Sequence, residues 1–362
     1  MKRIISICLI LIFACFLKSS ICYADSALVL PKGVTRIDVE FDFYIPIKER
    51  FNSDGDAVPL GDGLNIPLGL ILGNMDIPGR TDVTFELEHQ EYEILLSYGV
   101  TDKFSIGFLF PYYRTKNEVN AAVVDNPFVT IDDLQNLLQA YGYEPLENWS
   151  NNGISDIEMG GRYQYYKSDN WRLAFTGAVR FPTGDGANID SLNHFPHGDD
   201  AFSILLHSNN DYTGFKNILL NATIRYEIGL PYDDTFRVPA PGEFLTANKE
   251  ELERDPGDVF EIELQGTYRF DNGFGLSAVY EYGQKFEDSF SGGTRNSYSV
   301  LEEHTDVKSH IFIAYVSYST IEKYVAKEFS MPLDVSIGYR NRFAGENTLK
   351  SEYFALWTTL YF

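Results

Sequence analysis

Two histidine-containing segments have residue types that could support chemistry. His207 is followed directly by Ser208, and a histidine and a serine on one strand face could act as base and nucleophile. Neighbouring residues of a strand point to opposite faces, so this pair cannot form such a dyad. His194 and His197 precede two aspartates and could bind a metal ion, but two histidines in a loop more often bind none. We therefore expect no catalytic residue, no cofactor and no metal ligand.

The N-terminus has the features of an export signal. Lys2 and Arg3 precede an apolar run over residues 4–17, and Ala24 is a small residue suited to cleavage by signal peptidase. The apolar run is shorter than the roughly 20 residues that a transmembrane helix needs. We therefore expect a cleaved signal peptide over residues 1–24 and no membrane-spanning helix in the mature chain.

Composition excludes several classes of partner. All three cysteines lie within the expected signal peptide, so the mature chain needs neither disulfides nor thiolate-bound metal. Cleavage also removes Lys2, Arg3 and Lys18, which leaves 26 Lys and Arg against 52 Asp and Glu. Such an acidic chain is not expected to bind nucleic acid. With 24 Tyr and 27 Phe, it is also too aromatic to be disordered.

Polar and apolar residues alternate strictly from Thr35 to Ile45. Ile37, Val39 and Phe41 fall on one face of this segment, as a strand between two unlike environments requires. Similar segments recur along the chain and bring the expected strands to twelve, at residues 35–45, 92–98, 104–112, 157–165, 171–181, 202–206, 218–228, 260–270, 274–282, 307–318, 331–343 and 353–362.

The connections between these strands alternate in length. Short ones are expected at 99–103, 168–170 and 271–273, with longer members of the same series at 209–216 and 320–330. Long ones are expected at 48–80, 115–153, 183–199, 229–257 and 287–305, and 344–350 is the exception. Transmembrane barrels of bacterial outer membranes have an even strand number, short periplasmic turns and long outer loops. A soluble sandwich, the alternative, has no reason to keep this order.

The chain therefore resembles an all-β, twelve-stranded antiparallel transmembrane barrel over residues 25–362. Its last segment ends on Phe362 and resembles the terminal strands that outer-membrane barrels present to their assembly machinery, with Phe354, Leu356 and Leu360 facing lipid. Aromatic residues flank the short turns, as in an interfacial girdle, although aromatic residues also simply favour strands.

Two outer loops carry apolar segments. Thr130 and Asp133 form the pattern of a capping box, and leucines at helical spacing follow up to Gly142. This short helix is expected either to line the outer mouth or to bury its leucines against the barrel rim. Residues 66–73 are too apolar for water, and they either fold over the mouth or enter the lumen.

The polar strand faces would line the lumen. We expect the acidic residues toward the outer end and the basic residues nearer the periplasm, with Arg180, Arg225, Arg340 and Arg342 as exceptions. The expected pore-lining residues are Asp42, Glu86, Glu88, Asp156, Glu158, Glu261 and Glu263, together with Arg36, Arg162, Arg172 and Arg269. The functional interpretation is an acidic vestibule that concentrates cationic or neutral polar solutes. The alternative is a network of paired charges that closes the lumen.

Several segments together resemble a known family, namely residues 98–112, 130–142, 153–160, 179–185 and 198–201. They resemble a proteobacterial family of outer-membrane barrels of unknown function. They are more distantly similar to the transporter-like barrels assigned to the meta-pathway of phenol degradation. The resemblance covers about residues 85–206, implies the architecture, and supplies no catalytic residues.

Twelve strands lie between the filled eight-stranded barrels and the open porins with sixteen or more. We therefore expect a narrow passive channel for small solutes in the outer membrane of a Gram-negative bacterium. A closed barrel with a structural or surface-interaction role is the alternative, and an enzyme acting on lipid comes third. Expected partners are lipid, lipopolysaccharide and the barrel assembly machinery.

Overall fold

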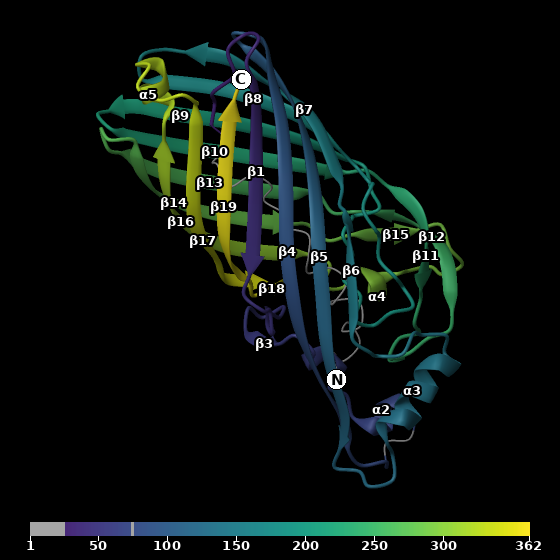
Figure 1. Cartoon of the computed structure of the whole chain (residues 1–362). Helices are drawn as coiled ribbons and strands as arrows, with labels where there is room; N and C mark the ends of the chain where they lie inside the picture. The colour runs from purple at the N-terminus through teal and green to yellow at the C-terminus, as the bar shows by residue number, and fades with distance from the viewer. Residues whose placement is uncertain (1–25, 74–75) are drawn as a thin grey trace.

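Twelve long strands dominate the computed structural model, which describes residues 26–73 and 76–362 (Figure 1). The expected signal peptide and its cleavage site lie outside the described residues. The twelve strands are β1 (Thr35–Tyr44), β4 (Arg80–Thr101), β5 (Phe104–Val124), β7 (Ile157–Lys167), β8 (Trp171–Phe181), β9 (Ser203–Phe215), β10 (Ile218–Gly229), β13 (Val259–Arg269), β14 (Phe274–Lys285), β16 (Val307–Ser319), β17 (Leu333–Glu346) and β19 (Glu352–Tyr361).

These strands close into a ring. Each pairs antiparallel with its neighbours in the chain, and β1 pairs with β4 on one side and with the terminal strand β19 on the other. The register of the closing pair runs from Arg36 opposite Tyr361 to Tyr44 opposite Tyr353. The closed twelve-stranded antiparallel barrel expected from the sequence is thus confirmed. Within the described residues, no helix is long and apolar enough to cross a membrane.

The two faces of the barrel wall differ in polarity as the alternation predicts. On β13, Leu264 is 50% exposed whereas the neighbouring Glu263 is 3% exposed. On β19, Phe354 is 53% exposed and Ala355 is 2% exposed. An apolar outer surface around the whole ring requires lipid contact. Aromatic residues beside the short turns are also exposed, as a girdle requires, and these include Tyr98, Tyr166, Trp171, Phe270 and Phe274.

The connections gather by length at opposite ends of the barrel. Figure 1 shows the short turns, the helix α5 (Ile321–Val325) and the C-terminus at one end, and the long connections at the other. The expected short connection at 209–216 proved wrong in extent, because β9 continues to Phe215 and pairs with both neighbours. Strands β4 and β5 also run well past the barrel rim, into segments expected to be loop.

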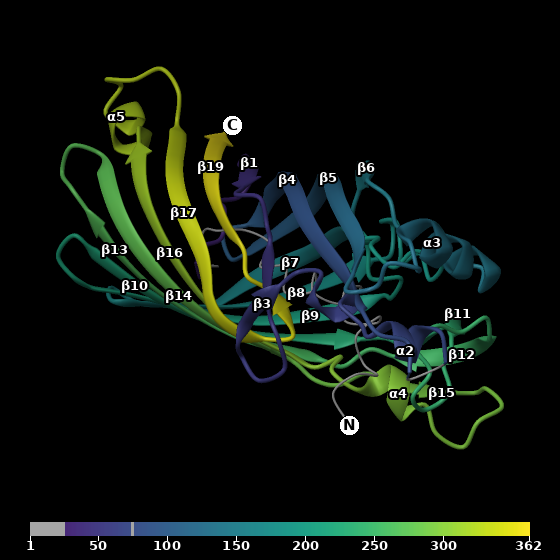
Figure 2. The same ribbon diagram turned by 90° about the horizontal axis from the view of Figure 1, so that it is seen from below.

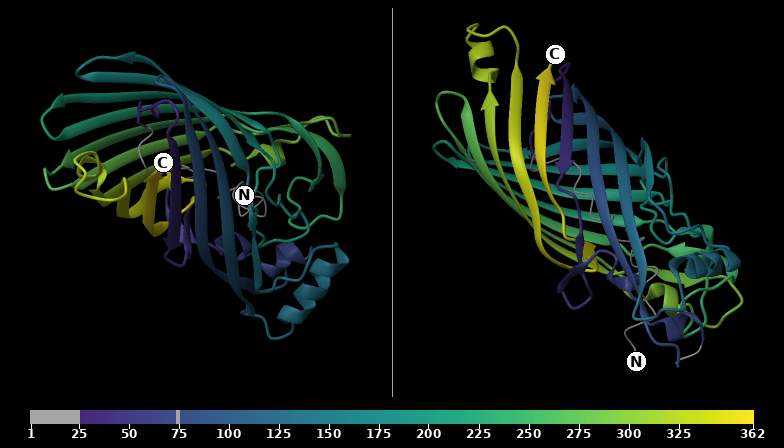
Figure 3. Two further views of the ribbon diagram at one scale, coloured as in Figure 1. Left: turned by 45° about the horizontal axis from the view of Figure 1, so that its top comes forward. Right: turned by 60° about the horizontal axis from the view of Figure 1, so that its bottom comes forward.

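The long connections carry the remaining elements, here called together the outer cap (residues 45–79, 125–156, 182–202, 230–258, 286–306 and 347–351). These elements are β2 (Glu49–Phe51), β3 (Ala57–Pro59), η1 (Asp62–Leu64), α2 (Leu68–Ile71), α3 (Ile131–Ala140), β6 (Trp149–Ile154), β11 (Tyr232–Arg237), β12 (Lys249–Asp255), β15 (Ser289–Ser291), α4 (Ser299–Glu302) and β18 (Thr348–Leu349). Figures 2 and 3 show them grouped at the end of the barrel that the β4–β5 extension reaches.

The outer cap has a hydrophobic core of its own. Five of its connections and the extension of β4 contribute to one cluster of buried side chains, namely Ile47, Leu60, Leu64, Val83, Phe85, Leu87, Leu138, Tyr143, Leu192, Phe195, Leu245 and Leu349. A loop set that buries this much apolar surface is a folded unit rather than a group of independent loops.

Both apolar segments singled out in the sequence belong to the outer cap. Helix α3 begins with the expected capping box, in which Thr130 N donates to Asp133 Oδ2 at 2.9 Å. Its Leu134 and Leu138 are buried, and Leu138 packs into the cap cluster beside β4. Leu68 of the other segment is fully buried and its backbone N donates to Gly79 O at 3.0 Å. The segment 66–73 therefore packs in the cap outside the lumen.

Candidate functional site in the barrel lumen

The inward-facing side chains enclose a cavity of about 760 Å³. Its wall extends to the short turn 271–273 and to α5, so the cavity reaches the short-turn rim of the barrel. The wall has apolar and charged parts. Tyr315 and Trp357 meet edge to face with 5.7 Å between ring centroids, while Arg162 and Arg225 belong to the charged part. A lumen with this volume is hollow, which distinguishes it from a filled eight-stranded barrel.

Residues 26–31 lie inside this cavity, which the sequence did not predict. Ser26 Oγ donates to Asp211 Oδ2 at 2.8 Å, and Ala27 N donates to Asp211 Oδ1 at 3.2 Å. Further along the segment, Leu30 N donates to Ser105 Oγ at 2.8 Å. Ala27 is fully buried. The segment therefore narrows the lumen and is held there by defined hydrogen bonds to the barrel wall.

Ion pairs hold the charged side chains of the lumen against its wall. Arg180 on β8 contacts Glu158 at 2.8 Å and Glu227 at 2.5 Å. Arg225 on β10 contacts Glu263 on β13 at 2.9 Å. Buried charges need such partners because the interior solvates them poorly. The pairing expected for a closed barrel is thus present, yet it leaves the cavity hollow.

Most of the residues expected to line the pore face inward, but they lie at different heights in the barrel and in the cap. Arg36, Glu158, Arg162, Glu261 and Arg269 belong to the wall of the large cavity. Asp42 lies in a smaller cavity farther out, and Glu263 is buried against Arg225. Asp156 is buried within the outer cap, where its carboxylate accepts from Gly184 N and Asp199 N at 3.0 and 2.8 Å. Arg172 belongs to neither of these two cavities.

Glu86 and Glu88 are corrections to the expected set, because they do not face the lumen. They share the strand face of Ile94, which is 45% exposed on the outside of β4. Glu86 pairs with Lys48 at 3.0 Å and Glu88 pairs with Lys116 at 3.4 Å, on the exposed surface of the β4–β5 extension. The alternation of β4 continues beyond the membrane, so outward-facing positions become polar there.

A second cavity of about 70 Å³ lies between the large cavity and the outer cap. Glu40 on β1 and Glu93 on β4 belong to the walls of both cavities. On the outer side the wall is formed by residues of the cap core, Phe195 among them, and by His197. The way outward from the lumen therefore passes two carboxylates and then meets the segment 195–197.

That segment is fixed by several polar contacts. His197 Nε2 lies 2.9 Å from Thr115 Oγ1, and His197 N donates to Asp185 O at 2.9 Å. Ser155 Oγ donates to His197 O. The ring of His197 also stacks on Tyr113 with 5.8 Å between centroids. The outer end of the lumen is therefore closed in this structure by an ordered loop.

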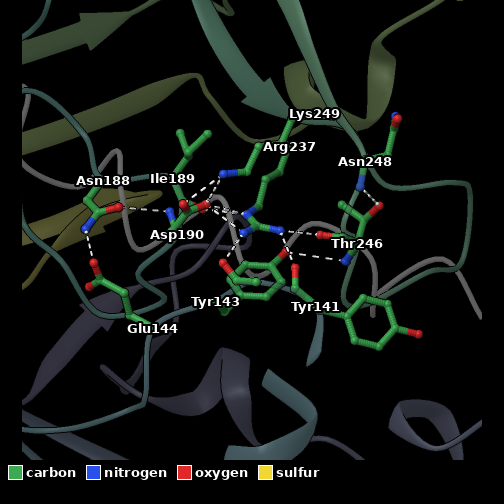
Figure 4. Close-up of polar contacts among 11 residues, drawn as sticks. Tyr141, Tyr143, Glu144, Asn188, Ile189, Asp190, Arg237, Thr246, Asn248 and Lys249 are labelled. Atoms are coloured by element: carbon green, nitrogen blue, oxygen red, sulfur yellow. Dashed lines mark hydrogen bonds and ion pairs between the residues drawn. The ribbon is translucent and has the colours of Figure 1, made fainter. Parts of the chain in front are cut away.

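Arg237 connects separate parts of the outer cap (Figure 4). Its guanidinium donates to Tyr141 O at 2.9 Å, to Gly142 O at 2.5 Å and to Thr246 O at 2.5 Å. It also pairs with Asp190 at 2.6 Å. Burial raises the pKa of Asp190, but hydrogen bonds from Lys249 and Arg237 outweigh it and hold that pKa below its ordinary value. One side chain thus joins three connections of the cap.

The two histidine segments lie in different surroundings. His207 belongs to the lumen wall, whereas Ser208 occupies the opposite face of β9. His194 packs on Trp149 with 5.2 Å between ring centroids, and burial lowers its pKa. Across the described residues, no group of three or more His, Cys, Asp or Glu side chains is arranged to hold a metal ion.

The expected pore-lining set lacks several acidic residues of the lumen, among them Glu40, Glu91, Glu93 and Glu281. On β4 a usable signal existed. Ile94 and Leu96 share one parity of this strand, and if that parity faces lipid, the other parity places Glu91 and Glu93 inside. The same count excludes Glu86 and Glu88.

Comparison with known proteins identifies a family for this chain and solved structures with a similar fold. A family profile described as "Putative MetA-pathway of phenol degradation" matches residues 50–302. A crystal structure of an outer membrane channel from Pseudomonas putida F1 is 14% identical, with a TM-score of 0.60, over 95% of this chain and 100% of that one. The toluene transporter TodX of Pseudomonas putida is 11% identical, with a TM-score of 0.38, over 91% and 89%. No curated protein matches the chain in sequence.

Proposed function

The chain belongs to this phenol-degradation family of barrels, and from its hollow lumen we propose that it is a passive channel for small solutes in the outer membrane. The proposal rests on one observation. A cavity of about 760 Å³ reaches the short-turn rim and shares Glu40 and Glu93 with the second cavity beneath the outer cap. A barrel with only a structural role needs no such inner cavity.

Direction follows from topology. Outer-membrane barrels place short turns in the periplasm, so the large cavity opens toward the periplasm and the outer cap faces the medium. A signal peptide over residues 1–24 would export the chain, and the aromatic-rich β19 would present it to the barrel assembly machinery. In this arrangement the segment 195–197 controls entry and residues 26–31 narrow the exit.

The carboxylates at the junction of the two cavities set the expected preference of the channel for cations over anions. Glu40 and Glu93 lie where the two cavities meet, and a carboxylate at a constriction attracts cations and repels anions. The family description makes small phenolic compounds a second solute class to test, and the apolar surface of Tyr315 and Trp357 in the wall is compatible with them.

The test is single-channel recording of the purified protein in a planar bilayer. We expect discrete conductance steps with cation preference, and we expect the double variant Glu40→Gln, Glu93→Gln to lose most of this preference while keeping side-chain size. Glu88→Gln is the matched control, because Glu88 is exposed outside the barrel. Salt at 1 M should weaken the preference in the wild type, since the Debye length falls to about 3 Å.

A closed barrel with a surface role is the second candidate, favoured by the folded outer cap and its acidity. Residues 229–257 alone contain seven acidic against three basic residues. Divalent cations could bridge these carboxylates to lipopolysaccharide, because oxygen ligands suit Ca²⁺ and Mg²⁺. Folded, heat-modifiable protein that never conducts would support this candidate and contradict the channel.

A further inference from the structure

The second cavity combines buried carboxylates with aromatic rings. Asp42 on β1 and Glu93 on β4 are each 4% exposed and both belong to its wall. Within the described part of the chain, Asp42 Oδ1 and Glu93 Oε1 have no hydrogen-bond partner. Buried polar atoms are almost always paired, so two unpaired carboxylate oxygens facing one small cavity indicate a missing donor.

The pairing of β1 with β4 intensifies the negative charge. Glu40 stands directly opposite Glu93, and Asp42 stands directly opposite Glu91. Like charges in direct cross-strand positions destabilise a sheet. The cavity thus has four carboxylates along two neighbouring strands, and their ionised forms need positive charge nearby.

The arginines of the same cavity compensate only part of this charge. Arg340 pairs with Glu281, which is itself fully buried, at 3.2 Å. Arg342 Nη1 donates to Leu349 O at 2.9 Å. These two arginines also bind groups outside the set of four carboxylates from β1 and β4. They therefore cannot neutralise all four carboxylates when these are ionised. A positively charged ligand would supply the balance.

Aromatic rings form the other part of the wall. Ring centroids are 4.4 Å apart between Tyr44 and Tyr353, and 4.8 Å apart between Tyr44 and His89. Those of His89 and Tyr113 are 5.2 Å apart. The faces of tyrosine rings attract cations and also bury apolar groups. A carboxylate wall facing an aromatic wall is therefore suited to a cation with a short carbon body.

We propose that this cavity binds small primary ammonium compounds, with the NH₃⁺ group at Asp42 and Glu93 and the carbon atoms against the tyrosine rings. A chelated metal ion is disfavoured because no group of three suitable ligands is assembled in residues 26–73 and 76–362. The volume of about 70 Å³ admits a few water molecules or a solute of a few heavy atoms. Since the cavity lies on the proposed route, this inference rests on the channel function and names a solute class for it.

The first experiment measures binding without transport. The full-length protein in detergent is unfolded by heat in methylammonium chloride, potassium chloride or N-methyl-D-glucamine chloride at one ionic strength. We expect methylammonium to raise the midpoint most, because a ligand that binds only the folded state stabilises it. Asp42→Asn and Glu93→Gln should each weaken methylammonium binding at least about tenfold, the loss expected for one hydrogen bond between charged groups. Glu88→Gln should bind as the wild type does.

The second experiment measures permeation in a planar bilayer with the same three cations. Conductance that favours methylammonium over potassium in the wild type and not in Asp42→Asn supports the inference. Conductance without that preference overturns the inference and leaves the channel standing. Stabilisation by methylammonium without any conductance keeps the site and rejects the channel. Equal stabilisation by potassium, or unchanged stabilisation in Asp42→Asn, rejects an ammonium site at these residues.

Discussion

Replacing Arg237 with alanine should loosen the outer cap and leave the barrel intact. Arg237 is 8% exposed, and its guanidinium joins the carbonyls of Tyr141, Gly142 and Thr246 to the carboxylate of Asp190 (Figure 4). It also lies over the ring of Tyr143, 3.8 Å from the ring centroid.

The expected cost follows from what the substitution leaves behind. The ion pair itself contributes little, because Asp190 is 32% exposed and solvent screens its charge. Asp190 would keep Lys249 at 2.7 Å, which lowers the electrostatic part of that cost. Three carbonyls would lose a donor, and each buried unsatisfied group costs about 1–3 kcal/mol. We therefore expect a loss of about 3 kcal/mol or more for the cap in total, chiefly from the three carbonyls.

Hydrogen exchange followed by mass spectrometry can locate this loss. Protection should fall by roughly a hundredfold or more in the segments 130–146, 183–199 and 237–249, and it should be unchanged in strands such as β13. Arg237→Lys should recover little, because an ammonium group cannot reproduce the forked donors of a guanidinium. Single-channel recordings should show longer or larger openings, since the segment 195–197 loses its support.

Lys249→Ala is the matched control for this prediction. Lys249 contacts the same carboxylate but is 37% exposed, so its ion pair should contribute only about 0.2–1 kcal/mol. If Arg237→Ala exchanged like the wild type, or like Lys249→Ala, the guanidinium would not be what holds the cap together. Loss of protection throughout the barrel would likewise contradict the view of the cap as a separate folded unit.

Three further outcomes are expected. Leu264→Arg on the lipid face should cost about 2–4 kcal/mol in urea unfolding from vesicles, while Gln265→Arg beside the large cavity should be tolerated, and equal damage would contradict the assigned faces. Asp211→Ala should release residues 26–31 and raise single-channel conductance, and an unchanged conductance would show that this segment does not limit flow. Burial raises the pKa of Asp200 in the cap to about 6. The folded cap therefore binds a proton at Asp200 more tightly than the unfolded chain does, and the cap should lose stability as pH rises from 5 to 7. Protease resistance of the cap should show this loss in the wild type and not in Asp200→Asn, and equal pH dependence in both would exclude Asp200 as its source.

The sequence alone determined the wall of the barrel and the end at which the long connections gather. Alternation with a period of two is a property of neighbouring residues, so segments such as Thr35–Tyr44 reveal both the strand and its lipid face without any distant contact. The alternation of short and long connections then places the termini and the cap. The capping box at Thr130 is equally local, because its partners lie three residues apart.

The site depended on contacts that no local pattern contains. Glu40 stands opposite Glu93 only because of the register in which β1 joins β4, fifty residues farther along the chain. Arg237 reaches carbonyls almost a hundred residues earlier because cap connections meet in one core. Glu86 and Glu88 were expected in the lumen but lie on the outward face of β4. The strand continues beyond the membrane there, and its outward face becomes polar.

Residues 26–31 show the same limit most clearly. Their sequence contains no regular alternation and no charge that predicts a place in the lumen. They are held by Asp211 of β9 and Ser105 of β5, which are far apart in sequence and stand on strands separated by β7 and β8 in the ring. Local patterning therefore fixes the wall of this barrel. The contents of the lumen depend on the closed ring and on the assembled cap, because each of these brings together residues that are far apart in sequence.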